Sequence, residues 1–147
     1  MKHIEQKILS RVTSFEANTK EEAVAYFAKL WHSRIAFEKH VKKRLDEGVI
    51  SDEYDYLQKT IECLAKADEY ILAAYEKSWD RLRYASNGDW FVIFNEDGII
   101  LTSHKKDETK VPFEQKHAQL GAKLQKGKVD EKFREVFKSI QAKLGKL

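Results

Sequence analysis

One helical segment carries side chains suited to proton transfer. The stretch FEKHVKKRLDEG places Phe37, His40 and Arg44 on one stripe of a helix, at positions i, i+3 and i+7. His40 then lies at the border of the buried face, with a cation one turn below it. Nearby positive charge lowers the pKa of a histidine, which suits a proton acceptor near neutral pH. A border histidine that only packs would have the same spacing, so both interpretations stay open.

A second group of polar residues lies in the stretch RYASNGDWFVIFNEDGIILTSH, residues 83–104. Strand alternation puts two sets of residues on one face each: Trp79, Arg81 and Arg83, and later Ile100, Thr102 and His104. Two arginines beside a Thr/His pair could clamp a phosphodiester and stabilise the charge that develops on it. Alternatively, nearby acids neutralise the arginines at the surface: Glu76, Asp80 or Asp89.

The first group requires a helical N-terminal half. Residues 3–15 are predicted to form a first helix, and Asn18-Thr19 offers an N-cap for a second one. Its helical period continues to Glu47, where Gly48 ends it. The segment Ser51-Asp52-Glu53 begins another helical stretch, whose inward residues continue through Ile71, Leu72 and Tyr75. After Pro112, a basic segment carries one more amphipathic stripe.

The second group requires a sheet. Asn87-Gly88 is a strong hairpin signal between residues 78–85 and 90–95, and the turn at 95–98 leads to a third strand, 99–104. The middle strand, WFVIF, is apolar throughout, so both of its faces should be covered, one of them by helices. The predicted core includes five residues: Phe27, Trp90, Val92, Ile93 and Phe94.

These elements predict a single α+β domain over residues 1–147. N-terminal helices (1–76) pack on a small antiparallel β-meander of three or four strands (77–107), and a basic helical tail (113–147) adds a C-terminal helix. Apolar residues make up 42% of the chain and charged residues 35%, which excludes a disordered protein. The apolar runs are too short for a membrane span, and the N-terminus has no signal-peptide pattern.

Several function classes are excluded by missing patterns. The single cysteine, Cys63, cannot form an internal disulfide, which favours a cytoplasmic location. The histidines and this cysteine lack the spacing of zinc ligands, so no metal site is expected. None of the six glycines fits a P-loop or a dinucleotide-binding pattern, so no nucleotide cofactor is expected either.

The net charge of +3 conceals a segregation of charge. Residues 1–50 carry 10 basic and 7 acidic groups, residues 51–100 carry 5 and 11, and residues 101–147 carry 12 and 6. Basic regions on either side of an acidic middle could hold a polyanion at one face, although a solvated charged surface would have the same composition. The lysines of residues 116–146 are expected to add affinity for RNA or for an acidic partner that weakens as salt rises.

Together, FEKHVKKRLDEGVIS and WDRLRYASNGDWFVIFNEDGIILTSHKKDE resemble the barnase–EndoU–colicin–RelE superfamily of small metal-independent ribonucleases, in its phage-associated and toxin branches. The resemblance covers residues 37–107. It implies that His40 is the base, with Arg44 beside it, that Arg81 or Arg83 binds the phosphate, and that Thr102 orients it. His104 or His117 would then supply the acid. Four lysines are assigned to RNA binding: Lys43, Lys105, Lys106 and Lys116.

The resemblance therefore implies a toxin-like bacterial or phage endoribonuclease, in which the ribose 2′-OH attacks the phosphodiester without a metal or cofactor. Its partners would be RNA and an antitoxin or immunity protein, with no membrane involved. The alternative is a non-catalytic interaction module: an antitoxin, an immunity protein or a phage accessory protein. If the predicted catalytic residues converge in one cleft, the enzyme is favoured, and if they scatter, the module is favoured.

Overall fold

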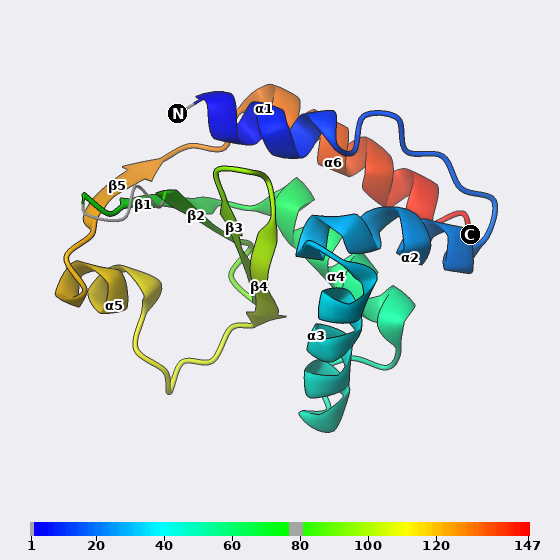
Figure 1. The fold of residues 1–147 in the computed structure, drawn as a ribbon, viewed down its shortest axis with the longest axis horizontal. Helices are drawn as coiled ribbons and strands as arrows, with labels where there is room; N and C mark the ends of the chain where they lie inside the picture. The colour runs from blue at the N-terminus through cyan, green and yellow to red at the C-terminus, as the bar shows by residue number, and fades with distance from the viewer. Residues whose placement is uncertain (1, 77–80) are drawn as a thin grey trace.

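The fold combines helices with one antiparallel sheet, as seen in a computed structural model (Figure 1). The structure describes residues 2–76 and 81–147, with the backbone alone for residues 2–4. In these ranges the helices are α1 (Lys2–Ser10), α2 (Lys20–Ala28), the 3-10 helix η1 (Lys29–Trp31), α3 (Arg34–Asp46), α4 (Glu53–Lys66), α5 (Phe113–Gln119) and α6 (Glu131–Leu144). The strands are β1 (Glu69–Ala74), β2 (Arg81–Ser86), β3 (Trp90–Asn95), β4 (Ile100–Lys105) and β5 (Lys123–Gly127).

The strands lie in the order β4-β3-β2-β1-β5, and every neighbouring pair is antiparallel. This arrangement confirms the predicted α+β class. Helices α1, α2, α4 and α6 pack over one face of the sheet, which we call the core face. The short helix α5 lies on the other side, which we call the open face, through the contact of Phe113 with Tyr84.

Two of the five strands lie where the sequence predicted helix. Residues 69–74 form β1 in the middle of the sheet, and residues 123–127 form β5 at its edge, inside the predicted helical tail. A short apolar run such as YILAA does not distinguish a strand from a buried helix by periodicity. In β5, four of the five residues are exposed and two are lysines, which is typical of edge strands but gives no apolar alternation. The predicted strand start at Ser78 and the place of Trp79 lie outside the described residues.

Alternation along β3 divides the apolar middle strand between the two faces. Trp90, Val92 and Phe94 are buried against the helices, as predicted, and Phe27 joins the same core. Ile93 is half-buried on the open face, so its predicted place in the main core is wrong. Helices cover the core face of β3 as expected, whereas the open face is only partly covered.

The long predicted helix up to Glu47 is interrupted. Thr19 caps α2 as predicted, because its Oγ1 accepts a hydrogen bond from the N–H of Glu22 at 3.1 Å. The chain then turns at His32, which has a φ of +80°, and Ser33 caps a new helix, α3, by accepting from the N–H of Ala36. This break sets α3 apart from α2 and directs it along the end of the sheet (Figure 1).

A bulge in β4 changes which residues share a face. Thr102 pairs with Ile93 but Ile100 pairs with Phe94, so Leu101 is an extra residue in the ladder. Ile100 therefore packs in the core, while Thr102 and His104 lie on the open face. The prediction that all three share one face is wrong for Ile100. A one-residue insertion of this kind leaves no signal in an alternation pattern.

Candidate nucleic-acid interface

The open face of the sheet carries a cleft of about 690 Å³. Strands β1 to β4 form its floor, and the segment after β4 together with α5 forms its far wall. Thr102 and His104 line it, as do three of the four lysines assigned to RNA binding, which are Lys105, Lys106 and Lys116. The fourth, Lys43, is exposed on α3 and is not among the lining residues. His117, the alternative acid, lines the cleft as well, so the cleft brings together six of the eleven residues predicted from the sequence.

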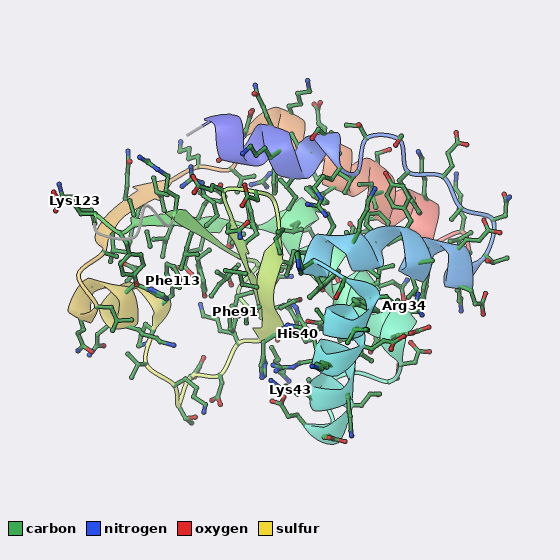
Figure 2. All side chains as sticks on the ribbon, viewed as in Figure 1. Arg34, His40, Lys43, Phe91, Phe113 and Lys123 are labelled. Carbon is green, nitrogen blue, oxygen red and sulfur yellow. The ribbon has the colours of Figure 1, made fainter. Side chains whose placement is uncertain are left out.

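Aromatic rings form a continuous row across this cleft. The rings of Phe91 and His104 are parallel within 2°, with centroids 6.2 Å apart, because the two residues are direct cross-strand partners. Phe91 also stacks on Tyr84 at 5.5 Å, and Tyr84 stacks on Phe113 at 4.7 Å. Phe91 is half-buried, whereas Tyr84 is covered by its neighbours. Figure 2 shows Phe91 and Phe113 on the side of the sheet away from α1 and α6.

Histidine 117 ends the row of rings. It packs against Phe113 at 4.2 Å, and a hydrogen bond joins its Nδ1 to the hydroxyl of Tyr75. Burial, reinforced by the charge of Lys116, lowers the pKa of His117, so the ring is neutral at pH 7. A histidine is therefore found at each end of the cleft, His104 on β4 and His117 on α5.

Charges at the cleft have mixed signs. Lys106 lies 3.6 Å from Glu69, and Lys126 on β5 lies 3.4 Å from Glu114 on α5. These ion pairs are exposed, so each contributes little to stability. The other lining lysines are Lys105, Lys110 and Lys116, and no ion pair involves them among the described residues. Of these three lysines, Lys110 and Lys116 lie in the far wall of the cleft, and Lys105 lies at the end of β4.

At the β4 end of the cleft, Glu47 bridges two of the predicted catalytic residues. Nε2 of His104 donates to Oε2 of Glu47 at 2.7 Å, and Nε of Arg44 lies 3.3 Å from Oε1 of the same carboxylate. The Arg44 side chain is only 11% exposed, whereas Glu47 is 41% exposed and lies on the solvent side. His104 and Arg44 are therefore linked through the carboxylate of Glu47, which lies between them.

His40 lies one helical turn before Arg44 and is half-buried (Figure 2). Burial first, and then the charges of Arg44 and Lys43, lower its pKa. The direction and the role of Arg44 agree with the prediction. His40 is not among the residues that line the cleft. The structure therefore supplies a neutral histidine next to the cleft and not inside it.

The two strand arginines do not reach the open face. Arg83 pairs with Phe94 across the ladder, so it points to the core face, where it is completely buried. Its Nε lies 3.6 Å from Oε1 of Glu5 on α1, which also accepts a hydrogen bond from the Tyr70 hydroxyl at 2.6 Å. Arg81 has the same parity and is exposed at the start of β2. The expectation that these arginines lie beside Thr102 and His104 is wrong, because an acid from a distant helix fixes Arg83 on the other face.

Two features of this site were not predicted from the sequence: the aromatic floor of the cleft and Glu47. The signal for the floor is present in WFVIF, since alternation must send Phe91 and Ile93 to whichever face Trp90 and Val92 do not use. Glu47 lies at i+3 from Arg44, the spacing of a helical ion pair, which identifies the pair but not its contact with His104.

The described ranges contain no cluster of three or more side chains that could hold a metal ion. Within them, no helix has the length and apolar content needed to cross a bilayer.

Comparisons with other proteins identify a family for the chain. The profile of the family described as "Uncharacterised protein aq_aa01" matches residues 21–145, which run from the second residue of α2 to the end of α6. A protein of that description from Aquifex aeolicus is 35% identical over 100 residues, or 66% of this chain and 75% of the relative. No solved structure shows a significant match.

Proposed function

The chain belongs to the family described as "Uncharacterised protein aq_aa01", and we propose that it binds single-stranded RNA on the open face of its sheet. One observation carries the proposal: the half-buried ring of Phe91 lies parallel to His104 on the floor of a cleft whose far wall carries Lys110 and Lys116. Antiparallel sheets with exposed aromatic rings bind RNA by stacking unpaired bases on those rings.

The position of the rings on the floor of the cleft favours this ligand over a folded duplex. Stacking one base on an aromatic side chain contributes about 1–3 kcal/mol, with little preference among bases. A paired base cannot reach a ring on the floor of a cleft, so the ligand must be single-stranded. Lys105 and Lys116 line the cleft and form no ion pair with another described residue, so they are available to contact the phosphates.

We expect Phe91→Ala to weaken binding of a fluorescein-labelled oligouridine by about 5- to 150-fold, because the base loses its stacking partner. Fluorescence anisotropy at fixed salt measures the change. Phe91→Tyr keeps the ring and should bind nearly as well as wild type. Wild-type affinity in Phe91→Ala, or the same loss in Phe91→Tyr, would contradict stacking on this ring.

A second candidate is metal-independent cleavage of the bound RNA, as the resemblance implies. Its specific support is the neutral, half-buried His40 one turn from Arg44, which Glu47 connects to His104 in the cleft. In this scheme His40 accepts the proton of the 2′-OH as the 2′-oxygen bonds to phosphorus, and Thr102 donates to a phosphate oxygen from the open face. The bond from phosphorus to the 5′-oxygen breaks, and His104 or His117, which both line the cleft, donates a proton to the leaving 5′-oxygen. The strand arginines take no part, because Arg83 is buried on the core face.

We expect RNA cleavage, where it occurs, to persist in excess EDTA and to leave 2′,3′-cyclic phosphate ends. His40→Ala should then abolish cleavage, and Thr102→Val should reduce it about a hundred- to thousand-fold without changing the melting temperature. Growth and RNA integrity after induced expression in bacteria test the toxin role at the same time, with and without a candidate antitoxin. If wild type and His40→Ala both bind RNA and neither cleaves it, the protein is a non-catalytic binding module.

A further inference from the structure

The contact between α3 and β4 contains a carboxylate in a position where a phosphate would fit. Glu47 uses one oxygen toward the Arg44 guanidinium at 3.3 Å and the other toward Nε2 of His104 at 2.7 Å. A phosphodiester likewise presents two non-bridging oxygens on one atom. Arginine and imidazole N–H groups are common donors to both kinds of anion.

We propose that Arg44 and His104 form a phosphate-binding subsite that Glu47 occupies in the free protein. When a phosphate arrives through the cleft, the Glu47 carboxylate turns out to solvent and the phosphate takes its place. This deepens the proposed function, on which it rests for the identity of the ligand, because it assigns the position of one backbone phosphate next to the aromatic floor.

The burial of Arg44 supports this subsite. Its side chain is 11% exposed, and its Nε and Nη1 atoms have no hydrogen-bond partner of good geometry in the described part of the chain. A buried guanidinium needs an anion, and Glu47 at 3.3 Å supplies charge without a well-aligned hydrogen bond. A phosphate has more acceptor oxygens, so it can satisfy donors that one carboxylate leaves without a partner.

The position of Glu47 makes it easy to displace. It is the residue that caps the C-terminal end of α3, where the helix dipole disfavours a negative charge. Its side chain is 41% exposed and lines the cleft together with Thr102 and His104. Movement of Glu47 toward solvent therefore opens the subsite directly into the cleft, without any change in the core.

The test compares Glu47→Ala with Glu69→Ala, using inorganic phosphate as the probe for the full chain. Both acids line the same cleft, their side chains are 41% and 39% exposed, and each pairs with a cation, so the two variants change the charge of the cleft equally. We expect phosphate to bind Glu47→Ala about tenfold or more tightly than wild type in calorimetry, because the competing carboxylate is gone. Glu69→Ala should show no more than a general electrostatic gain.

Thermal melting provides a second measurement if Glu47→Ala is unstable. Removing Glu47 leaves Arg44 unpaired, so the melting temperature of Glu47→Ala should be lower than that of wild type. Phosphate should then raise the melting temperature of Glu47→Ala by more than it raises that of wild type. Glu47→Gln retains the shape of the side chain and should give a smaller gain in the same direction. Adding His104→Ala to Glu47→Ala should remove the gain. Equal gains in Glu47→Ala and Glu69→Ala, or a gain that survives His104→Ala, would overturn the proposal.

Oligonucleotides separate this subsite from the proposed function. Oligouridine is tested with and without a 5′-phosphate. If the subsite binds a backbone phosphate, Glu47→Ala should bind both oligonucleotides more tightly than wild type does. If it binds a terminal phosphate, only the phosphorylated oligonucleotide should bind more tightly. A gain for inorganic phosphate with no binding of either oligonucleotide supports the subsite and rejects RNA as the ligand. If RNA binding depends on Phe91 but phosphate affinity is the same in Glu47→Ala and Glu69→Ala, RNA is supported as the ligand and the subsite is rejected.

Discussion

Arg83→Met lowers the free energy of unfolding by about 3–5 kcal/mol, the expected cost of removing one partner from a buried ion pair. The side chain of Arg83 is completely buried, and that of its partner Glu5 is 16% exposed. Methionine fills much of the volume but leaves the carboxylate of Glu5 with only the Tyr70 hydroxyl as its partner among the contacts described above. Urea denaturation measures the loss, and the melting temperature should fall by on the order of 10 °C.

Arg81 is the matched control, because it lies two residues earlier on the same strand and the same face but is exposed. Arg81→Met should change stability by less than about 0.5 kcal/mol. The pair also decides between a structural and a phosphate-binding role for Arg83. A stable Arg83→Met protein that loses RNA binding would return this arginine to the site, and would contradict its place in the core.

Ser103→Ala should lower the free energy of unfolding by about 1–3 kcal/mol, which is large for the loss of one oxygen atom. The Ser103 hydroxyl accepts from Nε1 of Trp90 at 2.8 Å and lies 2.6 Å from the Thr60 hydroxyl, which itself donates to the carbonyl of Tyr56. Ser103 must therefore donate to Thr60, and the three residues form one buried chain of hydrogen bonds between β4 and α4. Alanine leaves the indole N–H of Trp90 without an acceptor in a dry core.

Thr102→Val tests the same strand one residue earlier. Thr102 faces the cleft, and valine retains its shape and its preference for a strand, so stability should barely change. Thermal melting followed by near-UV circular dichroism of the aromatic side chains compares the two variants. Equal losses in both would mean that the open face contributes as much to folding as the core face does.

The predictability of the fold differed between the two faces of the sheet. The type of each apolar residue in WFVIF, with its turn signals, was sufficient to predict antiparallel strands and the burial of Trp90, Val92 and Phe94. Residue type failed for Arg83, because an arginine is buried only when a partner exists, and Glu5 lies 78 positions earlier in the chain. No local pattern contains that information.

For the candidate site, the sequence was sufficient to predict individual residues but not which of them lie together. His40 and Arg44 follow from helical spacing, and the lowered pKa of His40 follows from the cation one turn away together with its burial. The bulge at Leu101 and the turn at His32 decide which residues meet, and both depend on tertiary packing. As a result, Thr102 and His104 reach the cleft, whereas Arg81 and Arg83 do not.

Helix α1 packs where the turn between β3 and β4 passes beneath it. Gly98, with a φ of +75°, lies so close that a Cβ atom there would be 2.9 Å from the backbone of Ile8, and Lys7 lies 3.4 Å from Asp97. During synthesis, α1 therefore leaves the ribosome about 90 residues before its partner does, a delay of roughly 5–20 s at the usual rate of elongation. Nζ of Lys143 donates to the carbonyl of Phe15, so the segment after α1 gains this contact even later in synthesis. The side of α1 that carries Ile8 thus lacks its contact with Gly98 until the turn between β3 and β4 has been translated.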